Sequence, residues 1–266
     1  MAVFHVFLLV LVIGIVHHSH GRTYESESIT INGTDTLPVK APAPSNPQKN
    51  YDYFSLVLQW PKSFCNTGAV TCTSPIPNYF TVHGLWPQLY NGQWTNCNSD
   101  TKLNHDQRTK LNLMDFMKKY WPNLKSPGDN YRLWEHEYQK HGSCFSPFQE
   151  QPLLYFQKTV TMALQIRSVT NILYHSGGIW PSNREWYKLK AIEDAIFRHF
   201  NFIPRLRCNY AGGSGFVQLY EIEFCFERNG SLRDCNKAGD FTFSKCGNRQ
   251  VQPDPLNPVV MFPYPL

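Results

Sequence analysis

The chain has 266 residues, of which 42% are hydrophobic and 17% are charged, so it has enough apolar side chains to bury a core, and wholesale disorder is excluded. The formal net charge of +5 favours an anionic partner such as a nucleic acid. After the N-terminal segment no run of about 18 or more apolar residues occurs, which excludes a membrane protein with several spans.

The N-terminal segment resembles a signal peptide. Residues 3–16 form an apolar run that is short for a membrane span and is followed at once by polar residues. Residues 19–21 then place small side chains at the −3 and −1 positions of a cleavage site. No Lys or Arg precedes Arg22, and a membrane anchor is the alternative. We expect residues 1–21 to be a signal peptide, and the protein to be secreted to the extracellular space, with the vacuole as a second destination.

The composition divides the rest of the chain into three parts. Residues 22–50 are polar and rich in proline, which predicts a flexible leader. Residues 51–250 contain no linker, repeat or break in composition and are expected to form one domain. The tail, residues 251–266, contains five prolines and is expected to be extended coil.

Strands are predicted where aromatic and β-branched residues gather, at 53–60, 79–83 and 216–226. Asn229-Gly230 then signals a hairpin turn. Helical patterns cover residues 106–120, 130–141, 153–168 and 183–201. Ser182, with Glu185 three residues later, resembles a capping box that opens the last helix. Strands and helices mix without regular alternation, which predicts an α+β fold with a central antiparallel sheet and flanking helices.

Eight cysteines behind a signal peptide indicate disulfides. Zinc sites usually need cysteine pairs two to four residues apart, and this chain has none, so no metal site is expected. The spacing alone leaves the pairing open. Asn32 and Asn229 each begin an Asn-Gly-Thr/Ser sequon and are candidate glycosylation sites.

Residues 134–144, WEHEYQKHGSC, combine acid, base and cation in a helical pattern. Positions four apart share a helix face, so Glu137 lies beside His141 and His136 beside Lys140. A carboxylate can orient an imidazole and stabilise its charged form, and the two cations could attract an anion. A solvated surface helix is the alternative. A zinc protease motif is excluded, because a lysine stands where the second histidine is required.

Residues 80–87, FTVHGLWP, place His83 at the end of a strand, just before a glycine. Trp86 offers a flat ring on which a base could stack, and a core tryptophan is the alternative. Together with residues 134–144, this segment gives two histidines on separate secondary-structure elements. Such a pair suits concerted acid–base catalysis on an anionic phosphodiester. The histidines without such a motif, expected to be structural or exposed, are His105, His175 and His199.

The two segments resemble the active-site segments of the ribonuclease T2 family, in the same order and at a typical separation, and YFSLVLQWP resembles that family's opening strand. The resemblance runs from Tyr51 to Gly247 and is greatest to the plant secreted branch. It implies an α+β fold and a monomeric endoribonuclease without cofactor, which cleaves single-stranded RNA and not DNA and has no stable membrane association.

By resemblance, His83 is the general acid, His141 is the general base, Glu137 and Lys140 stabilise the transition state, and His136 binds the phosphate. The product of the first step is a 2′,3′-cyclic phosphate. The positions that resemble base-contacting residues are Gln59, Trp86, Asn123, Leu124 and Leu133. Gln59 and Asn123 could instead satisfy backbone groups. The family's disulfide pattern implies the pairs Cys65–Cys72, Cys97–Cys144, Cys208–Cys246 and Cys225–Cys235.

The resemblance leaves the biological role open. The basic charge favours the self-incompatibility ribonucleases of the pistil, with a regulatory protein as a further partner. An RNA-scavenging or defence ribonuclease is the alternative within the family. A secreted RNA-binding protein without catalysis is the alternative from another class.

Overall fold

The computed structural model describes residues 49–91, 95–112, 114–235, 243–244, 246 and 259–265. The predicted signal peptide, residues 22–48 of the leader and the sequon at Asn32 lie outside the described residues. Among the described helices, none combines the length and the apolar character needed to cross a membrane.

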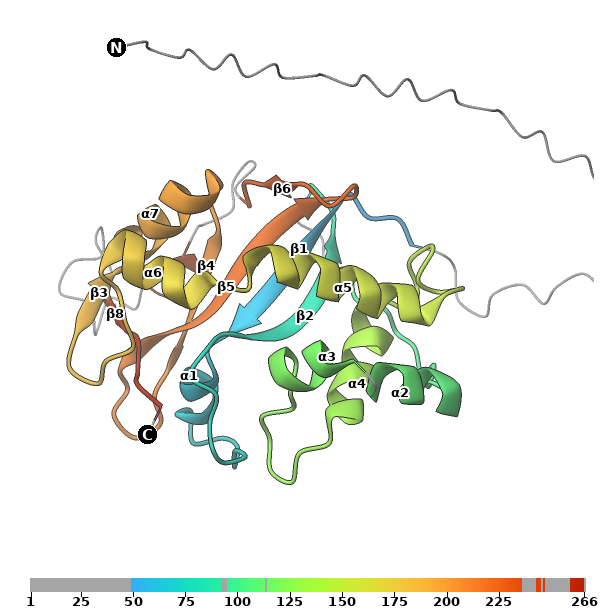
Figure 1. Cartoon of the computed structure of the whole chain (residues 1–266), viewed down its shortest axis with the longest axis horizontal. Coiled ribbons are helices and arrows are strands. Elements are labelled where there is room, and N and C mark those ends of the chain that lie inside the picture. Colours follow the sequence, from blue (N-terminus) through green and yellow to red (C-terminus); the bar gives the residue numbers. More distant parts are fainter. Residues whose placement is uncertain are drawn as a thin grey trace, which may run out of the picture. The chain divides into compact units, whose positions relative to one another are not determined.

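A central sheet organises the fold, as predicted (Figure 1). Its strands lie in the order β2 (Thr81–Gln88), β1 (Tyr53–Gln59), β5 (Val217–Glu227), β4 (Arg205–Tyr210) and β7 (Phe243–Ser244). The neighbours β2–β1, β1–β5 and β5–β4 are antiparallel, and the short β7 is parallel to β4. The shorter strands, paired with β5 or with each other, are β3 (Trp186–Lys188), β6 (Leu232–Arg233) and β8 (Val259–Met261).

Some of the helices agree with the sequence patterns. The helices are α1 (Pro61–Cys65), α2 (His105–Asn112), α3 (Asp115–Tyr120), α4 (Asn130–His141), α5 (Pro152–Ile166), α6 (Val169–Gly177) and α7 (Leu189–Phe200), of which α1 and α6 were not predicted. The predicted helix at 130–141 matches α4, because Asp129 caps its first turn by accepting a hydrogen bond from the Tyr131 N–H. The predicted helix at 106–120 is divided into α2 and α3, with extended backbone at Met114.

The helix predicted over 183–201 starts only at Leu189, so its first part is wrong. The Ser182 hydroxyl accepts hydrogen bonds from two backbone N–H groups, as a cap would, but these bonds close an isolated turn. The next residues form β3, which pairs with β8. A partner strand more than 70 residues away in the sequence therefore decides the local structure.

The described part of the C-terminal tail differs from the predicted coil, because Val259–Met261 form β8 within the sheet, and residues 251–258 lie outside the described residues. Phe262 follows with no exposed surface and packs against the rings of Trp60 and Phe80, with centroids 4.5 and 5.8 Å away. The Trp60 indole N–H donates to the carbonyl of Pro263 at 2.8 Å. The end of the chain is thus part of the core.

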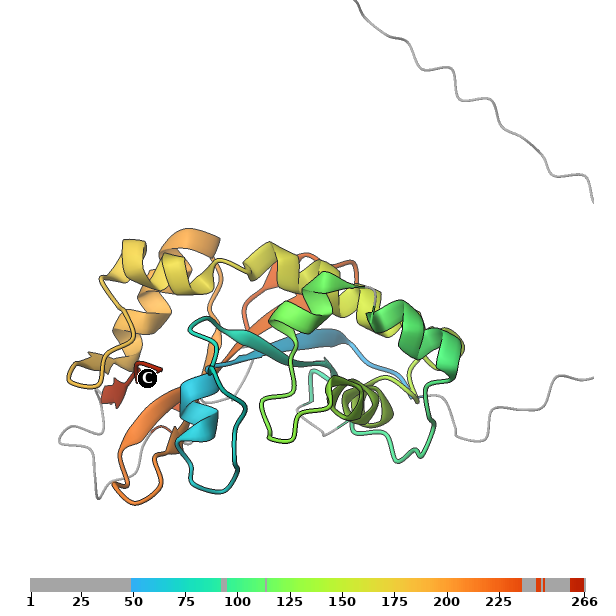
Figure 2. The same ribbon diagram turned by 60° about the horizontal axis from the view of Figure 1, so that its bottom comes forward.

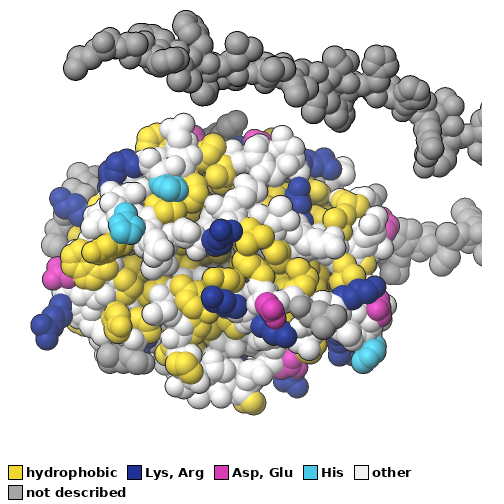
Figure 3. Space-filling model, in the orientation of Figure 1, with side chains coloured by type: hydrophobic (Ala, Val, Ile, Leu, Met, Phe, Trp, Pro, Cys, Tyr) yellow, Lys and Arg dark blue, Asp and Glu magenta, His cyan; other side chains and the backbone are white. Residues whose placement is uncertain are grey.

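The two faces of the sheet differ in chemistry. Along β5, Ile222, Phe224 and Phe226 alternate with acidic residues and cysteine, so apolar side chains lie on one face and polar ones on the other. The apolar face is covered by α5, α6 and α7, the yellow and orange helices on one side of the strands in Figure 2. Figure 3 views this covered side and shows Lys and Arg scattered among hydrophobic side chains. The polar face is the one that the site uses.

Four disulfides connect the described residues, and all pair as the family resemblance implied. Cys225–Cys235 spans the hairpin of β5 and β6, whose turn lies at Asn229-Gly230, as predicted. Gly230 has a φ of 93°, a conformation that a side chain would disfavour.

Replacing Phe262 tests whether the tail belongs to the core. We expect Phe262→Ala to lower the free energy of unfolding by about 3 kcal/mol, because it empties a fully buried aromatic site. Tyr264→Ala is the control, since Tyr264 is 49% exposed. Urea unfolding with the disulfides intact measures both, and equal stability of the two variants would contradict a structural role for the tail.

Candidate active site

His83 lies at an irregularity of β2. Val57 pairs with Gly84 and Leu58 with Val82, so His83 has no direct partner in the register. Such bulges bend a strand and redirect a side chain, and they are frequent next to active sites. The carbonyl of His83 accepts a hydrogen bond from the Trp121 indole at 2.9 Å, which fixes the bulge from the loop after α3. The imidazole is 28% exposed.

Helix α4 carries its polar side chains on two faces, one buried and one exposed. Trp134, Glu137, Tyr138 and His141 are buried, at the spacing of one helix face. His136 and Lys140 lie on the neighbouring face and are exposed. The same short segment thus supplies a buried glutamate and histidine together with an exposed histidine and lysine.

The Glu137 carboxylate lies between the two histidines. One oxygen is 3.7 Å from Nε2 of His83, and the other is 3.9 Å from Nε2 of His141. The Trp86 indole N–H donates to the second oxygen at 3.1 Å. A Cβ atom on Gly84 would lie 2.0 Å from this oxygen, so only glycine lets β2 and α4 approach this closely.

The two histidines have opposite pKa shifts. Burial disfavours the charged form of His83, but the carboxylates of Glu137 and Glu221 outweigh this and raise its pKa to about 9. Burial, followed by the positive charges of Lys140, His83 and His136, lowers the pKa of His141 to about 2. Near neutral pH, His83 therefore carries a proton that it can donate, and His141 is neutral and can accept one.

A cavity of about 370 Å³ opens between the polar face of the sheet, α1 and α4. It is lined by all of the site residues predicted from the sequence: Gln59, His83, Trp86, Asn123, Leu124, Leu133, His136, Glu137, Lys140 and His141. The other histidines, His105, His175 and His199, are exposed and do not line it, as predicted.

Trp86 is 7% exposed. Its ring stacks on His141 with centroids 5.1 Å apart, and the guanidinium of Arg207 lies 5.4 Å from its centroid. The low exposure and these contacts agree with the alternative, a core tryptophan. Base stacking on this ring stays a prediction.

The Asn123 side chain supports the loop before α4. Its amide donates to the carbonyl of Asp129 at 2.9 Å, and its oxygen accepts from the Lys125 N–H at 3.1 Å. These bonds agree with the turn-forming alternative. Gln59 is 5% exposed at the end of β1, and its role in base contact stays a prediction.

The sequence segments did not reveal the part of the site that β4 and β5 supply. Arg207 and Tyr220 line the cavity, and the Glu221 carboxylate lies 2.6 Å from Nδ1 of His83. The sequence does contain a pattern that could have indicated these residues: Arg-Leu-Arg in β4 and Glu-Ile-Glu in β5. In a strand, such alternation places the charged side chains on one face of the sheet. Among the described residues, no group of three His, Cys, Asp or Glu side chains is placed to bind a metal ion.

Comparison with known proteins relates this chain to ribonucleases. The model of the ribonuclease T2 family matches residues 51–235. Ribonuclease 1 of Arabidopsis thaliana is 37% identical over 76% of this chain and 86% of its own length. Ribonuclease S-2 of Solanum tuberosum is 34% identical over 66% of this chain and 78% of its own length.

A similar solved structure is that of RNase NT in complex with 5′-AMP. It superposes with a TM-score of 0.63 at 31% identity and covers 81% of this chain and 100% of its own. The fold therefore has counterparts among ribonucleases.

The charge of Glu137 can be tested without a substrate. We expect Glu137→Gln to lower the pKa of His83 from about 9, because the Coulombic attraction of Glu137 is the largest single cause that raises it. Histidine NMR titration measures this pKa, and the exposed Glu185→Gln serves as control. An unchanged His83 pKa in Glu137→Gln would contradict the electrostatic role of Glu137.

Proposed function

Because the chain belongs to the ribonuclease T2 family and is an endoribonuclease of that type, we propose that it cleaves single-stranded RNA by acid–base transphosphorylation, with His83 as acid and His141 as base. The observation that carries this proposal is the pair of opposite histidine pKa shifts at one cavity. An acid must be protonated and a base neutral at the same pH. Here two carboxylates keep His83 protonated, and burial, helped by nearby positive charges, keeps His141 neutral.

The reaction begins at the ribose 2′-hydroxyl. His141 accepts its proton as the oxygen attacks phosphorus, and His83 donates a proton to the 5′-oxygen as the P–O5′ bond breaks. The products are a 2′,3′-cyclic phosphate and a free 5′-hydroxyl. Water then opens the cyclic phosphate with the two histidines in exchanged roles. DNA has no 2′-hydroxyl and is not a substrate.

The other predicted site residues act on charge and position. Lys140 and His136 are exposed at the cavity and attract the phosphate, and Lys140 stabilises the charge that develops on its oxygens. Glu137 keeps both imidazoles in place. Leu124 and Leu133 supply apolar walls for a base, with Gln59, Trp86 and Asn123 nearby. The reaction requires no cofactor or metal.

For the setting, we propose a secreted monomer that reaches the extracellular space or the vacuole. The support is the predicted signal peptide and the four disulfides, which persist in oxidising compartments. Asn229 is exposed at the tip of the β5–β6 hairpin and carries a glycan in this proposal. The net charge of +5 supports a role as pistil self-incompatibility ribonuclease, with a regulatory protein as partner.

The histidine roles are tested by substitution. We expect His83→Ala and His141→Ala each to lower cleavage of single-stranded RNA by about 10²-fold or more, because each removes one proton transfer. His175→Ala is the control, since this histidine is exposed and lies outside the cavity. Excess EDTA is present throughout, and mass spectrometry identifies the ends of the products.

Cleavage of RNA alone, with 2′,3′-cyclic ends, is the expected result. Near-normal activity of either folded variant would overturn the assigned roles. A folded wild-type protein that binds RNA without cutting it would favour the binding-protein alternative.

The biological role is tested by expression. We expect transcripts to be confined to the style and the locus to be highly polymorphic between plants. Messenger RNA measurements across tissues and sequencing of several individuals check both. Induction in leaf or root under phosphate starvation, or after wounding, would favour the scavenging or defence alternative instead.

A further inference from the structure

Glu221 lies outside both recognised segments, yet it has the shortest contact with His83 among the site residues. One carboxylate oxygen is 2.6 Å from Nδ1 of the imidazole, and only 4% of the Glu221 side chain is exposed. The glutamate belongs to the central strand β5, opposite Gln59 of β1 and Arg207 of β4. A residue on the central strand of a sheet is a rigid support for a neighbouring side chain.

A carboxylate this deeply buried needs compensating charge. The Arg207 guanidinium supplies it at 3.9 Å, from the adjacent strand. Arg207 is itself paired with the carboxylate of Glu223, two residues along β5. The pairing with Glu223 therefore holds the Arg207 guanidinium beside Glu221.

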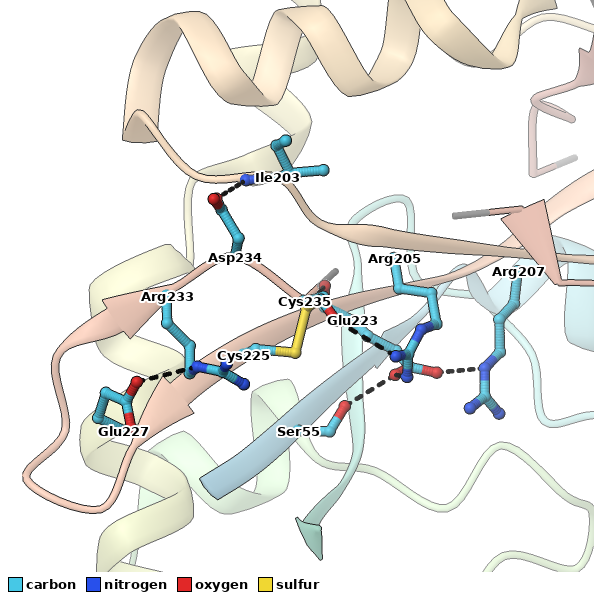
Figure 4. Close-up of a disulfide and its surroundings, with 10 residues drawn as sticks. All are labelled: Ser55, Ile203, Arg205, Arg207, Glu223, Cys225, Glu227, Arg233, Asp234 and Cys235. Carbon is cyan, nitrogen blue, oxygen red and sulfur yellow. Dashed lines mark hydrogen bonds and ion pairs between the residues drawn. A yellow bond between two sulfur atoms is a disulfide. The ribbon is translucent and has the colours of Figure 1, made fainter. Parts of the chain in front are cut away.

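The Glu223 network (Ser55, Arg205, Arg207 and Glu223) continues this support through the sheet (Figure 4). Glu223 accepts hydrogen bonds from the Ser55 hydroxyl at 2.8 Å and from Arg205 at 3.0 Å. Arg205 also donates to the carbonyl of Cys235, the residue that the disulfide links to β5. Three strands and the hairpin disulfide thus determine where Arg207 and Glu221 lie.

The contacts of His83 define which nitrogen faces the substrate. Glu221 occupies Nδ1, and Nε2 is directed toward α4, with the nearer oxygen of Glu137 at 3.7 Å. With a carboxylate on the Nδ1 side, the ring is held with its Nε2–H available to a leaving group. The same partner favours the imidazolium over the neutral ring.

We propose that Glu221 is the positioning residue of the general acid: it orients His83 through Nδ1, while the Glu223 network holds Glu221 in place. This inference rests on the proposed function of His83. Glu221 does not touch the substrate, and it acts through the imidazole alone.

Several other charged or titratable groups face His83, and they set the background for Glu221. They are Glu137, Lys140 and His141 from α4, while Arg207 from β4 and Tyr220 from β5 line the same cavity. Glu137 favours the imidazolium, whereas Lys140 opposes it. Removal of the Glu221 charge therefore leaves one favourable carboxylate, and His83 stays protonated only over a narrower pH range.

The test is the pH dependence of kcat/KM for wild type and Glu221→Gln on a dinucleotide substrate. Glutamine can still accept the Nδ1–H bond but carries no charge. His83 must be protonated to act, so activity falls as pH rises through its pKa, about 9 in wild type. We expect the alkaline limb of Glu221→Gln to move down by about one pH unit, which is about a fivefold loss at pH 9, approaching tenfold at higher pH, with a small change at pH 6.

Glu221→Ala removes the hydrogen bond as well, and we expect it to lower kcat at every pH. Glu227→Gln is the matched control, since Glu227 lies on the same strand and face but pairs with Arg233 outside the cavity. Circular dichroism and tryptophan fluorescence verify folding. A Glu221→Gln profile that superposes on wild type would overturn the proposal, because a merely structural role leaves the limb in place.

A measurement on the wild type alone covers the case in which the variants do not fold. We expect a downfield, slowly exchanging Nδ1–H proton resonance from His83, and its absence would overturn the proposal. Failure of the proposed function would look different. Wild type would then leave RNA intact, or His83→Ala would keep full activity, while the NMR signal would still report the contact between Glu221 and His83.

Discussion

A buried carboxylate determines how β2 and α4 meet. Glu137 is 3% exposed, and water is replaced around it by an indole N–H and two imidazoles. Removing a carboxylate from water costs several kcal/mol unless such partners are in place. The approach also requires Gly84, where a Cβ atom would overlap the carboxylate. Because one charge has these three partners, the two histidines are held on opposite sides of one acid.

The opposite behaviour of the two histidines follows from this arrangement. His83 lies between two carboxylates, one from α4 and one from β5, and these stabilise its proton. His141 is more deeply buried and lies among positive charges, which oppose protonation. Two histidines thus have opposite pKa shifts, and the difference comes from their positions, one on a strand of the sheet and one on a helix. The disulfide Cys97–Cys144 fixes the end of α4 three residues beyond His141.

Local sequence patterns correctly predicted a helix or strand where all the residues that define its ends lie close together in the chain. Helix α4 has an N-cap at Asp129 and a glycine after His141, and its predicted limits are correct. The segment from Ser182 has an equally good local signal, but β3 forms there because β8 supplies a partner. The proline-rich tail has a weak local signal, and it enters the core because Phe262 fills a site beside Trp60 and Phe80.

The sequence by itself identified the histidines that we propose as the reacting groups, since the order and spacing of the two histidine segments do not depend on the conformation of the chain. It also determined, through resemblance, how the eight cysteines pair. Only the tertiary structure decided the protonation of those groups. Glu221 reaches His83 across 138 residues of sequence, and Arg207 reaches Glu223 between neighbouring strands. The pKa of an imidazole depends on distance and burial, and neither is defined until the strands pair and the helix packs.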